Sequence, residues 1–286
     1  MNSQTSTAAP IRAAFARAKV AGRPALLPYV MAGYPDLATS EALAVALGGA
    51  GADLLELGVP FSDPQADGAT IQAASQRALD QGMTLAGALA LAGRITARIA
   101  TPLVLMTYYN PIFSYGLARF CAAAAEAGVA GLIVPDLPPE EAEALERAAA
   151  PHSLALVYLV APTSPEERIA RIVRAAEANG RGFLYCVSLS GVTGARERLP
   201  EHLAAFIARV RARTALPLAV GFGVSRAEHV AEIGQMADGA VVASALLNAV
   251  DAAPAEERVQ AGVEFLRGLR ETEKRETTES AEDAEA

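Results

Sequence analysis

The chain has 286 residues, of which 52% are hydrophobic and 20% are charged. This apolar fraction excludes an intrinsically disordered chain, and no short period indicates a collagen-like or repeat architecture. The formal net charge is −8, but residues 271–286 hold seven acidic and two basic side chains and so account for −5 of it. The remaining body is close to neutral, which predicts no binding of nucleic acid or of an anionic membrane.

The two cysteines, Cys121 and Cys186, are too few for a disulfide framework, and no C-x-x-C motif is present. We therefore expect a reduced, cytoplasmic compartment. The first twenty residues carry three basic side chains among alanines and no continuous apolar stretch, so a signal peptide is not expected. No apolar run approaches the ~20 residues that a membrane span needs.

Short apolar segments alternate along the chain with longer segments rich in alanine and leucine. The segments expected to form strands are 26–31, 53–57, 102–107, 131–134, 154–159, 182–187, 217–220 and 238–242. The expected helices cover about 37–50, 69–80, 84–98, 115–127, 138–149, 165–178, 200–214 and 253–270. Repeated βα units predict the α/β class, as a (β/α)8 TIM barrel with an extra N-terminal helix.

A doubly wound open sheet is the alternative fold, and it usually carries G-x-G-x-x-G after its first strand. Here that turn reads Ala32-Gly33-Tyr34-Pro35-Asp36, which favours the barrel. We expect one catalytic domain over 11–270, a flexible extension over 1–10 and an acidic disordered tail over 271–286. Capping boxes are expected at the helix starts Ser164–Glu167 and Ser225–Glu228.

Glu56 falls inside an expected strand, where an unpaired carboxylate costs several kcal/mol to bury. Alternation places Glu56 on the same face as Leu54, with Leu55 and Leu57 on the other face. Inside a barrel its pKa would rise by desolvation, as a general acid near neutral pH requires. A buried structural salt bridge is the alternative reading.

Asp67 lies in the loop that follows the same strand, just before an expected helix. It is either a helix N-cap or Asx turn, or a second carboxylate that faces Glu56 across a substrate. Asp63, between Ser62 and Pro64, is expected in a turn or a partner contact rather than in catalysis.

The last two βα loops have the composition of a phosphate site. Gly221–Ser225 follows the seventh strand, and Ala243-Ser244 opens a short helix after the eighth. Glycines let backbone N–H groups approach an anion, and a helix N-terminus adds a favourable dipole. A purely structural tight turn is the alternative. The long polar loop 188–198 has the composition of a lid over the substrate, and an ordinary surface loop is the alternative.

Two other chemistries are disfavoured by missing residue types. No lysine lies between residues 20 and 273, so a lysine Schiff base is excluded. The histidines His152, His202 and His229 are scattered and are not expected at the catalytic end, so no metal site is expected. A metal-free mechanism that uses carboxylates remains.

An ordered set of segments resembles the tryptophan synthase alpha subunit family and covers roughly residues 11–268. These segments are LPYVMAGYP (27–35), ELGVPFSDPQADGATIQ (56–72), MTYYNPIFSYG (106–116), VPDLPPEE (134–141), SLSGVTGAR (188–196) and GFGVS (221–225). The resemblance implies a lyase that performs the retro-aldol cleavage of indole-3-glycerol phosphate to indole and glyceraldehyde 3-phosphate. This reaction belongs to the last steps of L-tryptophan biosynthesis and needs no cofactor in this chain.

The resemblance also implies roles for individual residues. Glu56 and Asp67 match the two catalytic carboxylates: Glu56 protonates indole C3 and then assists removal of the glycerol hydroxyl proton, while Asp67 holds the indole N–H. Residues that match other family positions are Tyr185 beside Glu56; Tyr29, Met106 and Phe222 in the indole slot; Thr193 in the lid; and Gly194, Gly223 and Ser244 in the phosphate cradle.

The sequence departs from the family pattern at Ala69, where many members have proline, and at Ala243, where many have glycine. The first departure implies a slightly looser loop and the second a less close approach to phosphate. A backbone N–H can still donate from alanine, so we expect binding to be retained.

The family further implies a partner, a beta subunit that carries pyridoxal phosphate, in an alpha2beta2 heterotetramer. Asp63 and the Asn110-Pro111 loop are the expected contact surface. Two alternatives remain open: a free-standing lyase that releases indole without a partner, and a non-catalytic barrel that activates a partner enzyme.

Overall fold

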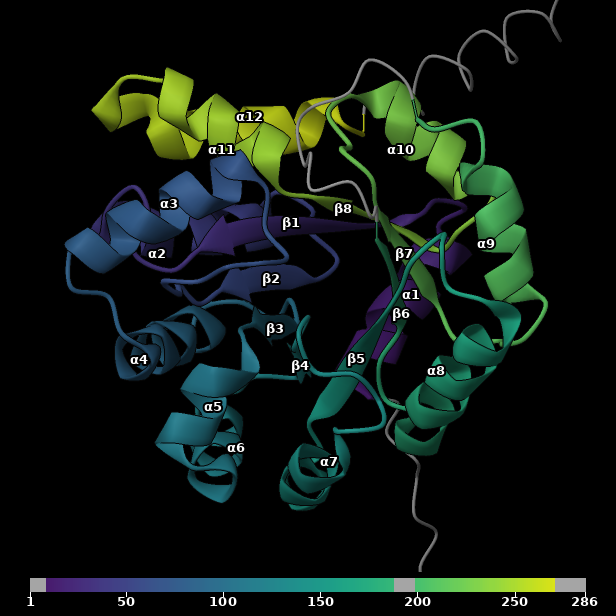
Figure 1. Cartoon of the computed structure of the whole chain (residues 1–286). Helices are drawn as coiled ribbons and strands as arrows, with labels where there is room; N and C mark the ends of the chain where they lie inside the picture. Colours follow the sequence, from purple (N-terminus) through teal and green to yellow (C-terminus); the bar gives the residue numbers. More distant parts are fainter. Residues whose placement is uncertain (1–8, 188–198, 271–286) are drawn as a thin grey trace, which may run out of the picture.

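The structure, a computed structural model, describes residues 9–187 and 199–270 and contains a closed barrel of eight parallel strands (Figure 1). Neighbouring strands follow the chain order, and β8 pairs with β1 to close the barrel. The strands are β1 Ala25–Met31, β2 Leu55–Gly58, β3 Leu103–Met106, β4 Gly131–Ile133, β5 Ala155–Val160, β6 Leu184–Val187, β7 Leu218–Gly221 and β8 Gly239–Val242. The predicted TIM barrel is confirmed, and the doubly wound sheet is excluded.

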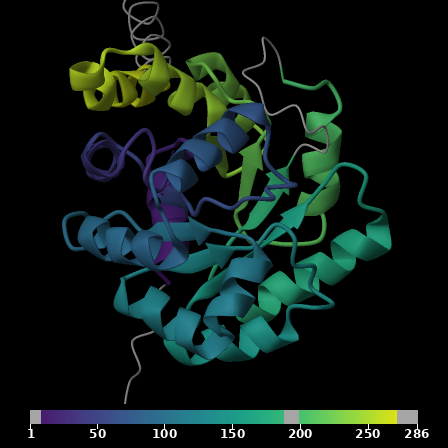
Figure 2. The same ribbon diagram turned by 60° about the vertical axis from the view of Figure 1, so that its left-hand side comes forward.

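The helices lie around the outside of the strands, as Figure 2 shows from a second direction. The helices before β5 are α1 Pro10–Val20, α2 Leu37–Gly49, α3 Ala69–Asp80, α4 Leu85–Thr96, α5 Tyr109–Tyr115, α6 Leu117–Glu126, α7 Glu143–Ala149 and the 3-10 turn η1 Ala150–His152. Those after it are α8 Glu166–Asn179, α9 Leu203–Arg211, α10 Ala227–Gly234, α11 Ser244–Ala252, η2 Ala255–Glu257 and α12 Arg258–Gly268. The extra N-terminal helix is confirmed as α1.

Some expected boundaries and one expected loop were wrong. The segment with Asn110 and Pro111 is the helix α5 rather than a loop. Pro111 lies in its first turn, where the missing N–H leaves no hydrogen bond unmade. The helix expected over 138–149 is shortened to α7, and the one expected over 253–270 is divided into η2 and α12.

The two predicted capping boxes do not form. Helix α8 begins at Glu166, after Pro165 in extended conformation, and the Ser164 hydroxyl instead accepts the N–H of Ala161 at 3.3 Å. Helix α10 begins at Ala227, with Arg226 rather than a serine at its N-cap position. In both cases the chain stays extended one residue further than the capping pattern implies.

Side chains on alternate strand positions form two layers. The inward layer fills the barrel and includes Leu27, Leu54, Val104, Val157 and Val241, while the outward layer packs beneath the helices. Helix α1 closes the amino end of the barrel with Ile11 and Phe15; the Phe15 ring lies 5.4 Å from that of Phe183. The polar groups of the candidate site lie toward the opposite, carboxyl end of the barrel.

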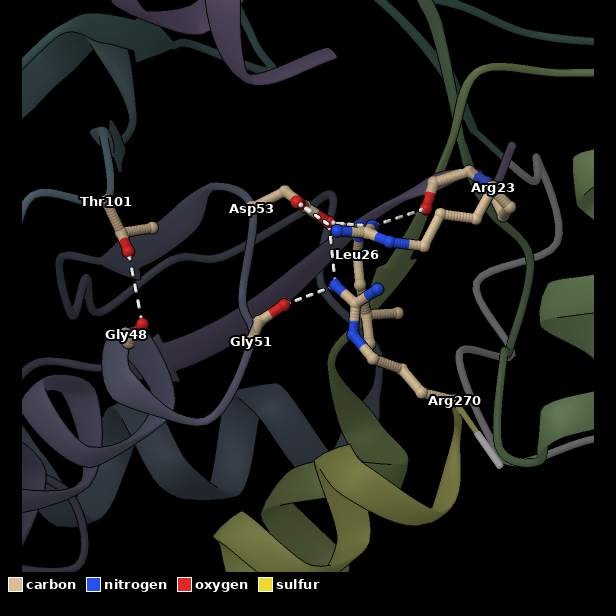
Figure 3. Close-up of polar contacts among 8 residues, drawn as sticks. Arg23, Leu26, Gly48, Gly51, Asp53, Thr101 and Arg270 are labelled. Atoms are coloured by element: carbon tan, nitrogen blue, oxygen red, sulfur yellow. Dashed lines mark hydrogen bonds and ion pairs between the residues drawn. The ribbon is translucent and has the colours of Figure 1, made fainter. Parts of the chain in front are cut away.

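A polar cluster at the edge of the barrel joins distant parts of the chain (Figure 3). The carboxylate of Asp53, just before β2, accepts hydrogen bonds from Arg23 at 2.7 and 3.0 Å, from the Leu26 N–H at 2.8 Å and from Arg270 at 2.7 Å. Arg270 also donates to the carbonyl of Gly51. The end of the described chain is therefore fastened to the segments that enter β1 and β2.

Candidate active site

Glu56 lies in β2, and its register partners are Tyr29 on β1 and Val104 on β3. The expected alternation is confirmed, because Leu54 faces the barrel interior while Leu55 and Leu57 belong to the outer layer. Glu56 is 1% exposed, and neither carboxyl oxygen has a hydrogen-bond partner among the residues that the structure describes. No salt bridge of Glu56 therefore forms within residues 9–187 and 199–270.

This environment favours the neutral form of the Glu56 carboxyl group. Burial removes water from around the charged form, and the negative charge of Asp67 repels it. Together they raise the pKa of Glu56 to about 8, so that most of this side chain is protonated at neutral pH. A carboxyl group in this neutral form can donate a proton.

Asp67 lies in the loop between β2 and α3 and is 9% exposed. The N-cap interpretation is wrong, since Gly68 occupies the N-cap position of α3 and Asp67 is hydrogen-bonded to Tyr108 instead. Burial raises the pKa of Asp67 to about 6, and the hydrogen bond from the Tyr108 hydroxyl opposes this shift. At neutral pH Asp67 is therefore the ionised member of the pair.

Tyr108 is a site residue that the sequence analysis missed. It follows β3. Its hydroxyl accepts a hydrogen bond from the N–H of Ala66 at 2.9 Å and donates one to the carboxylate of Asp67. Its ring stacks on Phe61 with the centroids 5.2 Å apart. Its position directly after the strand that neighbours the Glu56 strand was a signal that could have identified it.

Two further tyrosines share this environment. Burial raises the pKa of the Tyr29 and Tyr185 hydroxyls, and the charges of Glu56 and Asp67 raise both pKa values further. The structure therefore brings both tyrosines close to the two carboxyl groups, a position that the resemblance implied for Tyr185 and not for Tyr29. Glycines make room for them: a Cβ on Gly58 would lie 1.9 Å from the Tyr29 hydroxyl, and one on Gly221 would lie 2.7 Å from the Tyr185 ring.

The expected indole-slot residues are only partly brought together. Met106 packs in the same apolar cluster as Tyr29. The Phe222 side chain, in contrast, is 1% exposed in the outer layer, where its ring lies 6.3 Å from that of Phe206. Phe222 continues the alternation of β7, in which Leu218 and Val220 also face outward.

The two expected phosphate loops follow β7 and β8, which are adjacent strands of the barrel. Gly223 follows β7 with a φ of +76°, a conformation that glycine adopts readily. Ser244 begins α11 directly after β8 and is 7% exposed. Thr193 and Gly194 lie outside the described residues, as do the whole expected lid, the expected tail 271–286 and residues 1–8 of the expected extension 1–10; residue 10 of that extension instead begins α1.

Within residues 9–187 and 199–270, no three His, Cys, Asp or Glu side chains gather closely enough to hold a metal ion. His152 ends η1 before β5, His202 precedes α9 and His229 lies within α10. No helix of the described part of the chain is long and apolar enough to cross a membrane.

The fold and the site define a class of protein: a (β/α)8 barrel with two buried carboxyl groups, on β2 and in the loop that follows it, whose pKa values are both raised. Comparison with known proteins gives the family. The family model for the tryptophan synthase alpha chain matches residues 15–275, and the chain belongs to this family. It is accordingly a carbon–carbon lyase of tryptophan biosynthesis, which cleaves indole-3-glycerol phosphate.

Individual relatives agree with this assignment. The tryptophan synthase alpha chain of Roseiflexus sp. (strain RS-1) is 54% identical over 257 residues, which is 90% of this chain and 97% of that one. The solved structure of Mycobacterium tuberculosis tryptophan synthase has a TM-score of 0.84 at 38% identity and covers 92% of this chain and 97% of its own. Tryptophan synthase subunit alpha from Legionella pneumophila str. Paris has a TM-score of 0.82 at 38% identity and covers 91% and 97%.

Proposed function

We propose that Glu56 and Asp67 are the two groups with which this lyase cleaves indole-3-glycerol phosphate to indole and glyceraldehyde 3-phosphate. The observation that carries the proposal is the buried Glu56 carboxyl, which has no partner among the described residues and whose pKa is raised to about 8. A carboxyl group that is neutral at pH 7 and faces into the barrel can give a proton to a substrate bound there.

The reaction needs a proton at indole C3 before the bond to the glycerol carbon can break. Glu56 donates this proton, and the ring nitrogen becomes a positively charged iminium. The ionised Asp67, at the indole N–H, stabilises that charge. The Glu56 carboxylate then takes the proton of the hydroxyl on the adjacent glycerol carbon. The C–C bond breaks as the aldehyde forms, its electron pair returns to the indole ring, and Glu56 is protonated again.

The surrounding residues supply binding and orientation in this proposal. Tyr29 and Met106, which belong to the same apolar cluster, offer an apolar wall for the flat indole ring. Tyr185 completes the slot beside Glu56 in this proposal. The phosphate is assigned to Gly223 and to Ser244 at the N-terminus of α11, together with Gly194, while Thr193 belongs to the lid.

We also propose a beta-subunit partner, which would hold the pyridoxal phosphate in an alpha2beta2 heterotetramer. This chain itself would use no cofactor. On α5, Phe113 is 64% exposed, and it follows Asn110 and Pro111. Together with the exposed Asp63, these residues are our candidates for the contact surface. The reduced compartment that the two unpaired cysteines favour is the cytoplasm.

The catalytic assignment is tested by indole release from indole-3-glycerol phosphate in Glu56→Gln and Asp67→Asn variants. Glutamine keeps the size of Glu56 but cannot donate a carboxyl proton, so we expect kcat to fall at least about a hundredfold. Unchanged turnover in a folded Glu56→Gln variant would remove Glu56 from the mechanism and would favour a non-catalytic role for this carboxyl.

The partner assignment is tested by the same assay with the unmodified chain, alone and after addition of a tryptophan synthase beta subunit. Weak indole release that rises many-fold with the partner is the expected result. Equally strong release without the partner would instead identify a free-standing lyase.

A further inference from the structure

His229 is a buried polar side chain that the proposed mechanism does not use. It lies in the first turns of α10 and is 3% exposed, next to the buried Val230 and on the same helix as the buried Ile233. A histidine that is nearly fully enclosed in a protein core is expected to have a hydrogen-bond partner. One hydrogen-bond partner of His229 indicates the role of this side chain.

The partner belongs to the loop that links β7 to α10. The backbone N–H of Ser225 donates to Nδ1 of His229 at 3.4 Å. A ring nitrogen can accept a hydrogen bond only when it carries no proton, so this contact uses His229 with an unprotonated Nδ1. The helix thus reaches back four residues to hold the end of the preceding loop.

Two further contacts fix the same loop from the core side. The side chains of Phe222 and Val224 are 1% and 2% exposed and belong to the outer apolar layer. Between them Gly223 turns with its φ of +76°. The loop is therefore anchored at Phe222, Val224 and Ser225, and the Ser225 anchor is the polar one.

We propose that His229 is a positioning residue for the phosphate group of the substrate. This inference rests on the proposed function, in which the Gly223 loop binds that phosphate. Backbone N–H groups bind an anion tightly only when their directions are fixed before the anion arrives. By holding the Ser225 N–H, His229 keeps the loop in one arrangement, although it touches no reacting atom itself.

The test compares indole release from indole-3-glycerol phosphate and from indole-3-glycerol, which lacks the phosphate. In His229→Leu we expect KM for the phosphorylated substrate to rise about three- to tenfold, the usual effect of one lost hydrogen bond, with kcat changed less than about twofold. The kcat/KM for indole-3-glycerol is expected to stay within about twofold of the unmodified chain.

Two other variants separate positioning from folding. His229→Asn can place its amide oxygen near the position of Nδ1 and is expected to restore most of the lost affinity. His229→Gln keeps a polar side chain, but its acceptor oxygen lies further along the side chain than Nδ1 does. We therefore expect the same rise in KM as in His229→Leu, and the glutamine variant provides the test if the leucine variant fails to fold. Val230→Ala, in the same helix, is the control: it loosens packing but retains the Ser225 contact, and its KM values should not change.

The inference is overturned if His229→Leu or His229→Gln leaves KM for indole-3-glycerol phosphate unchanged. It is equally overturned if both substrates lose affinity by the same factor, since that result indicates general loosening of the barrel. Failure of the underlying phosphate assignment gives a different result: the unmodified chain would then not prefer the phosphorylated substrate.

Discussion

At the scale of residues, two carboxylic acids have different protonation states because their surroundings differ. Glu56 has no hydrogen-bond donor among the described residues, and its pKa is raised to about 8. Asp67 accepts a hydrogen bond from the Tyr108 hydroxyl, and its pKa is raised only to about 6. At a pH between these two pKa values, Glu56 is a neutral acid and Asp67 is an anion. The proposed mechanism needs this combination of a proton donor and a fixed negative charge.

The pH dependence of kcat/KM should therefore be bell-shaped. We expect activity to fall as the pH drops through about 6, because Asp67 becomes protonated, and to fall again above about 8, because Glu56 loses its proton. Tyr108→Phe removes the hydrogen bond that favours ionised Asp67, so the acid limb should move to higher pH while the alkaline limb stays in place.

The matched control is Tyr109→Phe, which removes a hydroxyl from the next residue, whose ring packs 6.0 Å from that of Phe113. Its pH profile should equal that of the unmodified chain. An acid limb that does not move in Tyr108→Phe would show that this hydroxyl does not influence Asp67.

Glu56 could be predicted from the sequence because a carboxylate in an apolar strand is anomalous in itself. Tyr108 could not be predicted with the same ease, because its role depends on a contact with a loop 42 residues away. For Asp67 the spacing alone left a helix cap and a catalytic role equally open. Only the position of Gly68 at the start of α3 removed the first.

At the scale of elements, the pairing of β1 with β2 determines where Tyr29 and Glu56 meet. The two residues are register partners, and two residues further on Met31 pairs with Gly58. The Tyr29 ring crosses to lie against Gly58, where no side chain fits. The small residue on one strand thus allows the large one on its neighbour to reach the two carboxylates.

Gly58→Ala should consequently displace Tyr29. Because the new Cβ would lie 1.9 Å from the Tyr29 hydroxyl, we expect kcat/KM to fall at least about tenfold and stability to fall by about 1–3 kcal/mol. Gly93→Ala in α4 is the control, since its Cβ would meet Ala127 at an ordinary 3.8 Å. Indole-release assays and urea unfolding distinguish the two, and normal activity in Gly58→Ala would contradict this account of Tyr29.

The sequence predicted all eight strands because buried parallel strands are short and continuously apolar. It did not predict α5, whose aromatic residues and Pro111 give no helical apolar stripe. It also placed Phe222 in the indole slot by resemblance, whereas the alternation of β7 directs that ring to the outer layer. Applying the same alternation that located Glu56 would have identified this difference.

At the scale of the whole molecule, the two ends of the barrel differ: one holds the candidate site and the other holds stabilising contacts. The carboxyl end holds Glu56 and Asp67, the proposed acid–base pair. The amino end is closed by α1 and by the ion pairs of Asp53 with Arg23 and Arg270. Burial alone would raise the pKa of Asp53, but the hydrogen bonds from Arg23, Leu26 and Arg270 outweigh it and hold that pKa below its ordinary value. This group should therefore contribute to stability without contributing to catalysis.

Asp53→Asn should lower the free energy of unfolding at pH 7 by about 2–3 kcal/mol, because two arginines lose their common counter-charge. The depressed pKa means that this contribution is complete above the unfolded value of about 3.9 and is lost as the pH falls through the lower folded value. Urea unfolding should thus show the gap between variant and unmodified chain shrinking at acidic pH.

Glu143→Gln is the comparison for Asp53→Asn. It removes the charge from an exposed pair with Arg147 and should cost less than about 0.5 kcal/mol at any pH. If the two variants were equally stable, the Asp53 cluster would be no more important than a surface ion pair.

The most direct test of the central claim is a titration of the Glu56 carboxyl itself. Carbon-13 NMR of the chain labelled at the glutamate side-chain carboxyl carbon, compared with Glu56→Gln for assignment, reports its protonation state at each pH. The account predicts a single glutamate resonance that titrates with a midpoint near pH 8 and is absent from the variant. A midpoint near the ordinary value of 4.5 would mean that Glu56 is ionised at neutral pH and is not the proton donor.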